Sequence, residues 1–159
     1  TLCKIITGYL KNYQGEVRID KKQKENGYNP IQLIFQHPEK TLNPKVKMKT
    51  SLNESWQVSK EVMESMGIKE EWLNRYPTEL SGGELQRFAL ARAIGPETKF
   101  IIADEITTML DAITQAQIWE IMTKIAKERN IGILVVSHDQ NLMEKICNKT
   151  IHLNDINQI

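Results

Sequence analysis

Three short, largely apolar runs, rich in β-branched residues, constrain the fold of this chain more than any other feature. They comprise residues 31–35, 100–103 and 131–136. Helix-like stretches separate the runs, and this alternation is typical of a mainly parallel sheet covered by helices on both faces. Ligands bind such sheets at the carboxyl ends of the strands. The sequence therefore predicts a site built from the polar residues at those ends, which are Gln36, Asp104, Glu105 and His138.

A run of small residues precedes the second apolar run. Residues 80–87 read Leu-Ser-Gly-Gly-Glu-Leu-Gln-Arg, in which Ser81 and Glu84 have the spacing of a capping box at a helix N-terminus. Capping does not require two glycines in a first helical turn, where each costs up to about 1 kcal/mol relative to alanine. We therefore expect something to approach the backbone of Gly82 and Gly83 closely. Free backbone N–H groups and a helix dipole suit an anion such as a phosphate.

Two adjacent carboxylates, Asp104 and Glu105, end the second apolar run. Such a pair offers a ligand for Mg²⁺ and a general base for water. An isolated acidic pair at a strand end can equally be solvated, and an isolated glutamine or histidine there is more often a polar boundary residue. The order in which the motifs follow one another is what favours a shared site.

In this order the motifs resemble those of the ATP-binding subunits of ABC transporters, whose signature reads Leu-Ser-Gly-Gly-Gln/Glu and whose Walker B strand ends in Asp-Glu. The resemblance covers essentially the whole chain. It implies an α/β fold of the P-loop NTPase (RecA-like) type, with a mainly parallel sheet and an inserted helical subdomain. The expected layout is a single partial ABC ATPase domain, with a core fragment over residues 1–36, the helical subdomain over 37–80, and the signature helix and remaining core over 81–159.

The resemblance also implies a role for each residue at the strand ends. Glu105 would polarise the attacking water, His138 would contact the γ-phosphate of ATP, and Gln36 would sense Mg²⁺ and that water. Asp104 would hold Mg²⁺, with Gln36 beside it. ATP and Mg²⁺ are therefore the expected cofactors.

The segment after the carboxylates resembles the family's D-loop, in which Asp-Glu-Pro leads to Ala-Leu-Asp. Here Ile106 replaces the usual proline and Met109 the usual alanine, and the loss of a fixed φ at Ile106 predicts a less rigid loop. Asp111 is retained and would contact a partner subunit, although its position also suits a helix N-cap. The residues that the resemblance assigns to nucleotide binding are Thr1, Ser81, Gly82, Gly83, Glu84 and Asp111.

No Gly-x-x-x-x-Gly-Lys-Ser/Thr occurs in the chain, although the resemblance requires this phosphate-binding P-loop. Residues 1–8 resemble the stretch that follows the P-loop lysine, which would make Thr1 the neighbour of the Mg²⁺-binding hydroxyl. We therefore expect the chain to be a fragment of a complete ATPase. As given, it is expected not to hydrolyse ATP, because the phosphate nest and the lysine are missing.

Four stretches resemble the peptide/nickel importer group of bacterial ABC ATPases in particular. They are residues 35–38 with 41–44, 75–80, 103–108 and 115–118. The function that this implies is the hydrolysis of ATP to energise the import of peptides, nickel or metal chelates. The cargo stays open, because the substrate of such a translocase does not touch its ATPase subunits.

The expected partners are a second ABC ATPase subunit, in a homo- or heterodimer, and membrane permease subunits that contact the helical subdomain and Gln36. An extracytoplasmic binding protein would act indirectly, and the chain would lie peripherally on the cytoplasmic face of the cell membrane. Other interpretations stay open: an exporter ATPase, an SMC-type DNA-repair ATPase, or a truncated, non-catalytic interaction module. An SMC-type protein would need a long coiled coil, whereas only about forty-five residues separate Gln36 from Ser81.

The composition is that of an ordinary globular domain. Of the 159 residues, 40% are hydrophobic and 26% are charged, and a formal net charge of +1 gives no electrostatic case for nucleic acid as a partner. Cys3 and Cys147 lack metal-site spacing and suggest reduced, structural thiols. Periodicity further predicts one helix over about residues 51–66, a strand at 17–19 and a hairpin over 149–159.

Overall fold

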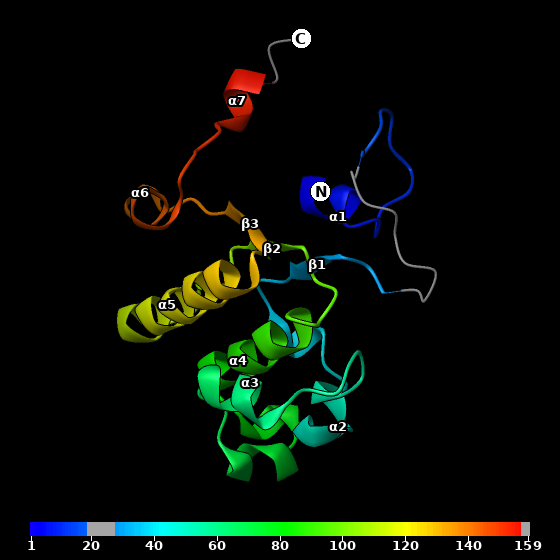
Figure 1. The fold of residues 1–159 in the computed structure, drawn as a ribbon, viewed down its shortest axis with the longest axis vertical. Coiled ribbons are helices and arrows are strands. Elements are labelled where there is room, and N and C mark those ends of the chain that lie inside the picture. Colours follow the sequence, from blue (N-terminus) through cyan, green and yellow to red (C-terminus); the bar gives the residue numbers. More distant parts are fainter. Residues whose placement is uncertain (19–27, 157–159) are drawn as a thin grey trace.

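The computed structural model describes residues 1–18 and 28–156, and its centre is a three-stranded sheet with helices on both sides (Figure 1). The strands are β1 (Ile31–Ile34), β2 (Phe100–Asp104) and β3 (Gly132–Val136). They lie in the order β1-β2-β3, and both pairs are parallel. The predicted parallel α/β sheet is therefore confirmed.

Helices α4 and α5 lie against one face of the sheet, while α1 lies against the other face beside β1 (Figure 1). The helices are α1 (Leu2–Ile6), α2 (Met48–Leu52), α3 (Lys60–Ser65), α4 (Gly82–Ala93), α5 (Ala112–Arg129), α6 (Gln140–Ile146) and α7 (Leu153–Ile156). Short 3₁₀ helices span Pro38–Lys40, Glu70–Asn74 and Pro77–Glu79. Residues 37–80 thus contain helices joined by turns and irregular segments, and no strand. Among the described residues, no helix has the length and apolarity that a membrane crossing requires.

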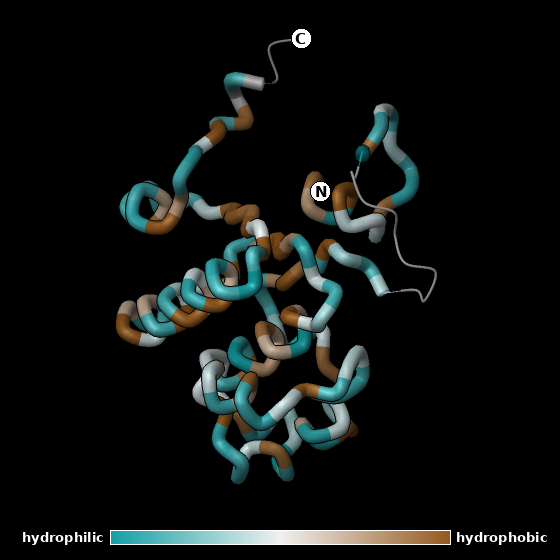
Figure 2. Tube along the Cα trace, viewed as in Figure 1, coloured by the Kyte–Doolittle hydropathy of each residue, from teal (hydrophilic) through white to brown (hydrophobic). Residues whose placement is uncertain are grey.

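Two apolar clusters cover the two faces of the sheet. Successive side chains of a strand point to opposite faces, so Ile101 belongs to the larger cluster with α4 and α5, and Ile102 to the smaller one beneath α1. Phe88 and Leu90 of α4 are fully buried in the larger cluster. Figure 2 shows the strands as mostly hydrophobic, as expected of strands buried on both faces.

The predicted helix over residues 51–66 is wrong, because the chain forms α2 and α3 with a break between them. The side chain of Asn53 accepts a hydrogen bond from the Val58 amide at 2.9 Å, and the Ser59 hydroxyl caps α3. Within the break, the Trp56 indole N–H donates to the carbonyl of Arg92 in α4 at 3.2 Å. Polar side chains therefore stop one helix and start the next, in spite of the continuous apolar spacing.

The predicted C-terminal hairpin is also wrong. The residues expected to form its turn lie in α7, where the Asp155 amide donates to the His152 carbonyl at 3.0 Å. Residues 157–159 lie outside the described part of the chain. In the predicted strand at 17–19, Val17 lies in no strand, and Ile19 is outside the described residues.

Leu90→Ala is expected to lower the free energy of unfolding by about 2–5 kcal/mol, because the Leu90 side chain of α4 is fully buried in the larger apolar cluster. Leu134→Ala is the matched control. Leu134 is 42% exposed on β3, so the same truncation there should cost about 1 kcal/mol or less. Urea denaturation measures both variants, and equal losses would contradict the assignment of Leu90 to the core.

Candidate functional site

The register of the sheet aligns the ends of its three strands. Ile34 of β1 pairs with Ala103, and Asp104 of β2 pairs with Val136 of β3. The amide of Glu105 donates to the Val136 carbonyl at 2.9 Å, which continues the ladder one residue past β2. The carboxyl ends of all three strands therefore meet at one edge. The predicted site residues that follow the strands there are Gln36, Glu105 and His138.

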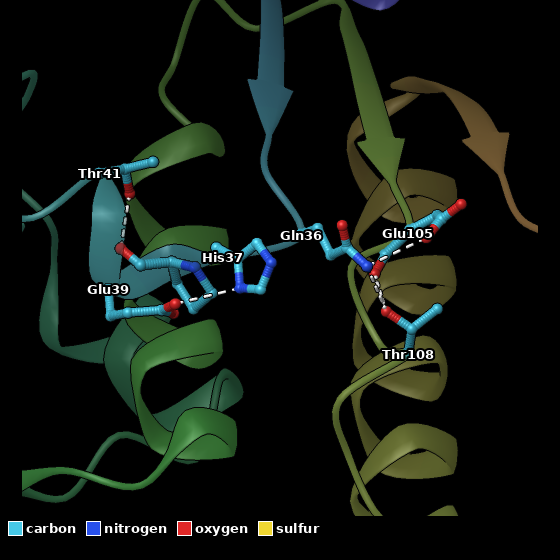
Figure 3. Close-up of polar contacts among 7 residues, drawn as sticks. Gln36, His37, Glu39, Thr41, Glu105 and Thr108 are labelled. Carbon is cyan, nitrogen blue, oxygen red and sulfur yellow. Dashed lines mark hydrogen bonds and ion pairs between the residues drawn. The ribbon is translucent and has the colours of Figure 1, made fainter.

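The structure brings these three side chains into contact around Glu105. The amide nitrogen of Gln36, Nε2, donates to Glu105 Oε2 at 3.0 Å and to Thr108 Oγ1 at 3.1 Å (Figure 3). His138 Nε2 lies 3.0 Å from Glu105 Oε1. The side chain of Glu105 is 23% exposed and that of His138 is 91% exposed. The carboxylate is therefore held within the fold while the imidazole stays open to solvent.

The backbone at Glu105 has a conformation that few residues other than glycine adopt. Its φ is +51°, in the left-handed region, which costs a residue with a side chain about 1–3 kcal/mol. The Glu105 carbonyl accepts hydrogen bonds from the amide and the hydroxyl of Thr108, at 3.3 and 2.9 Å. This tight turn sets the direction in which the Glu105 side chain leaves the strand.

Asp104 does not join the Glu105 cluster. Its carboxylate lies beside the thiol of Cys3 in α1, on the other face of the sheet. Burial raises the pKa of the Cys3 thiol, and the negative charge of Asp104 raises it further. Thr1, the exposed N-cap residue of α1, makes no side-chain capping bond. The two adjacent carboxylates thus point in different directions, because Asp104 ends β2 and the tight turn at Glu105 redirects the second one.

The available oxygen atoms fit the predicted Mg²⁺. Gln36 uses its amide nitrogen in both of its hydrogen bonds to side chains, so the amide oxygen is the atom left to face a cation or water. Asp104 contributes a half-buried carboxylate. Mg²⁺ typically binds one or two carboxylates and completes its shell with water and phosphate oxygens, so the chemistry of these donors suits it, although no contact among the described residues joins Asp104 to Gln36.

The signature residues lie in a different cavity. A groove of about 540 Å³ is lined by residues 81–84 and by Met109, Leu110 and Asp111. A second cavity, of about 360 Å³, is lined by Glu105 and His138 among others, and no lining residue is common to the two. The structure therefore does not bring the signature residues together with the Glu105 cluster within one chain.

The capping box predicted at the start of α4 is confirmed. Ser81 Oγ accepts from the Glu84 amide at 3.3 Å, and Glu84 Oε2 accepts from the Ser81 amide at 2.7 Å. The expected close approach occurs at one glycine: a Cβ on Gly83 would lie 2.8 Å from Cγ2 of Thr114 in α5. A Cβ on Gly82 would lie 3.8 Å from its nearest neighbour. Helix packing thus accounts for Gly83, whereas the phosphate contact stays a prediction.

Asp111 is the N-cap of α5, as its position suggested. Its side chain accepts from the amides of Ile113 and Thr114, at 3.1 and 3.0 Å, and from the Thr114 hydroxyl at 2.7 Å. The bond from the Thr114 hydroxyl is the main cause that lowers the pKa of Asp111, and the backbone amides add to it. Asp111 is exposed and lines the groove beside the signature residues.

Three side chains that sequence reasoning missed support the two cavities. Thr108 shares the Gln36 amide with Glu105, and the Trp119 indole N–H donates to Thr107 at 3.1 Å. Arg87 of α4 donates to the Met66 carbonyl and to Gln117 of α5, both at 2.8 Å. Arg87 and Thr108 lie in stretches that carry the family resemblance, whereas Trp119 carries no sequence signal.

His37, the neighbour of Gln36 in the sequence, faces away from the cluster. Its Nδ1 lies 3.1 Å from Glu39 Oε1, and Figure 3 shows this pair on the far side of Gln36 from Glu105.

Gly83→Ala is expected to lower the free energy of unfolding by about 1–3 kcal/mol, because the added methyl group collides with the short side chain of Thr114. Gly82→Ala, one residue earlier, has room and should be neutral or stabilising by up to about 1 kcal/mol. Thermal or urea unfolding of the two variants checks this. If Gly83→Ala were as stable as Gly82→Ala, close packing of α4 on α5 could not be the reason for Gly83.

Comparisons with known proteins place these features in a family. The family model described as "ABC transporter" matches residues 1–108. Among curated relatives, the oligopeptide transport ATP-binding protein OppF of Bacillus subtilis is 34% identical over 132 residues, which is 75% of this chain and 43% of that protein. The dipeptide transport ATP-binding protein DppF of Escherichia coli is 31% identical over 163 residues, 94% of this chain and 49% of that protein. The chain thus spans about half the length of these relatives or less.

A solved structure shows the same fold. It is the dimeric structure of a post-hydrolysis state of the ATP-binding cassette MJ0796 bound to ADP and Pi. It has a TM-score of 0.69 and 26% sequence identity, and the match covers 89% of this chain and 70% of that one. The fold agrees with the P-loop NTPase class that the sequence implied. With the family match covering most of its length, the chain belongs to the ABC transporter family.

Proposed function

We propose that this chain is the ATP-binding and ATP-hydrolysing part of a subunit that energises peptide import across a cell membrane. The observation that carries the proposal is the contact of Gln36 and His138 with the two oxygens of Glu105. Relatives named for oligopeptide and dipeptide transport support the choice of a peptide importer. Import of nickel or metal chelates is the alternative that the sequence left open.

Glu105 is the proposed general base. With one oxygen accepting from Gln36 and the other 3.0 Å from His138 Nε2, the Glu105 carboxylate still has lone pairs open to accept a proton from water. Its partial burial keeps it in place, while the exposed imidazole of His138 is free to meet a phosphate. Gln36 orients the carboxylate through its amide nitrogen and can hold water through its amide oxygen.

Asp104 and the amide oxygen of Gln36 are the proposed Mg²⁺ ligands. A bound Mg²⁺ would neutralise charge on the phosphate oxygens as the phosphoryl group is transferred. Asp104 is suited to this role because it is half-buried at the end of β2 and is not engaged with the base Glu105. Thr1, at the start of α1, lies on the same face of the sheet as Asp104 and is the proposed neighbour of the nucleotide there.

The groove at the signature residues is the proposed second half of a nucleotide site shared between two subunits. The groove and the Glu105 cavity have no lining residue in common, which agrees with a nucleotide that lies between the Glu105 side of one subunit and Ser81, Gly82, Gly83 and Glu84 of another. The solved relative is a dimer. Whether this chain pairs with itself or with a related subunit is left open.

The remaining partners follow from this role. Membrane permease subunits would contact residues 37–80 and Gln36, and an extracytoplasmic binding protein would deliver the cargo. The chain would then act as a peripheral subunit on the cytoplasmic face of the membrane. The proposed division into a core (1–36 and 81–159) and a helical subdomain (37–80) agrees with the helices and turns found in 37–80.

In the full-length protein, Glu105→Gln is expected to lower ATP turnover at least ~100-fold. Its affinity for ATP should stay within a few-fold of that of the unsubstituted protein. The amide keeps the shape of the side chain but cannot accept the proton. Phosphate release and equilibrium ATP binding measure the two effects. Glu128→Gln, an exposed glutamate of α5, is the matched control. Undiminished turnover in the Glu105 variant rules out the proposed base.

The cargo is tested in vesicles that contain the ATPase with the permease subunits that assemble with it. Addition of the binding protein that docks on these permeases, loaded with peptide, is expected to raise ATP turnover, whereas the same protein with nickel or a nickel chelate is not. Stimulation by nickel alone would replace peptide by metal as the cargo. Stimulation by neither would leave the ATPase in place and overturn the importer assignment.

A further inference from the structure

A six-residue loop, residues 105–110, leads from β2 to Asp111, the N-cap of α5, and forms part of both cavities. We call it the carboxylate loop because it begins with Glu105. Its backbone closes on itself: the Thr108 amide and hydroxyl donate to the Glu105 carbonyl, and the Leu110 amide donates to the Thr107 carbonyl at 3.1 Å. These bonds give the loop its shape but do not fix where it lies on α5.

One side-chain hydrogen bond supplies that attachment. The indole N–H of Trp119, in α5, donates to the hydroxyl of Thr107 at 3.1 Å. Trp119 is 4% exposed and Thr107 is 3% exposed. Among the hydrogen bonds of the described residues, it is the one that ties the carboxylate loop to the body of α5. A buried hydroxyl that loses such a donor is left unpaired away from water, which is costly.

The attachment is connected to the Glu105 carboxylate through a short path. Thr107 precedes Thr108, whose hydroxyl donates to the Glu105 carbonyl at 2.9 Å and accepts from Gln36 at 3.1 Å. Gln36 in turn donates to the Glu105 carboxylate at 3.0 Å. A displacement of Thr107 from α5 would therefore shift the partners that orient Glu105.

The sequence of the loop explains why such an attachment matters in this chain. Ile106 stands where the resemblance expects proline, and it packs into the core at 3% exposure. Packing buries the Ile106 side chain, but isoleucine leaves free the φ that a proline ring would fix. Trp119 lines the same cavity as Glu105, so its hydrogen bond acts next to the site.

We propose that Trp119 is a positioning residue: by donating to Thr107, its indole holds the carboxylate loop on α5 and keeps Glu105 between Gln36 and His138. Its effect on the loop follows from the contacts of the described residues. Its effect on turnover rests on the proposed function. The test therefore measures the loop and the reaction separately.

Amide hydrogen exchange measures the loop, in Trp119→Phe and in Thr107→Val, which removes the hydroxyl but keeps the shape of the side chain. Each variant is expected to exchange about fivefold faster at the amides of residues 108 and 110, the equivalent of one ordinary hydrogen bond. Thr107→Ser keeps the hydroxyl and should restore slow exchange. The double variant should be no faster than either single one, because both remove the same bond.

Trp56→Phe is the matched control. It loses an indole hydrogen bond of similar length, 3.2 Å, to the Arg92 carbonyl, but far along the chain from the carboxylate loop. This variant should leave exchange at residues 108 and 110 unchanged. Unchanged exchange at those amides in Thr107→Val, or equal acceleration by Trp56→Phe, would overturn the proposal.

ATP turnover of the complete polypeptide gives the second readout. Trp119→Phe and Thr107→Val should lower kcat about fivefold with the KM for ATP unchanged, and Thr107→Ser should restore kcat. A fall in kcat that Thr107→Ser does not rescue would overturn the positioning role. If neither the unsubstituted protein nor any variant turned over ATP, the proposed function would fail. If the exchange results still held, the attachment of the loop by Trp119 would stand.

Discussion

The parallel pairing of β2 with strands on both sides is the constraint on which the rest of the structure depends. Ile101 and Ile102 are buried on opposite faces of the sheet, so the middle of β2 has no solvent-facing side on which to carry a functional group. Polar chemistry can begin only where the strand ends. Because both neighbours are parallel and in register, their ends reach the same edge, and the carboxylate that follows β2 finds partners from two distant segments.

The signature run shows how one residue pattern can serve two purposes. Consecutive glycines in a first helical turn suggest a ligand near the backbone, yet at Gly83 the nearest neighbour is Thr114 of the same chain. That contact lets α4 approach the start of α5 and places Ser81 beside Asp111 along one groove. Gly83 therefore lets the helices pack closely and also lines the groove, together with the capped backbone at Ser81.

The sequence predicted the parts of the structure that depend on local chemistry. The three strands of the sheet, the capping box of α4 and the N-cap at Asp111 follow from apolar runs and short-range hydrogen bonds, and these are present. The break between α2 and α3 was missed because apolar spacing continues across it, while Asn53 and Ser59 provide the bonds that end one helix and begin the next. The contacts of Trp119 could not be predicted, because they join residues whose meeting is decided by tertiary packing.

The carboxylate loop borders both cavities. Residues 105–108 line the cavity of Glu105, and Met109 and Leu110 line the groove of the signature residues. A substitution that adapts the loop to a ligand in one cavity thus alters the other cavity as well, which limits how independently the two cavities can diverge. If the ligand in each cavity favours a particular position of the loop, thermodynamic reciprocity requires that the two ligands change each other's affinity by the same factor.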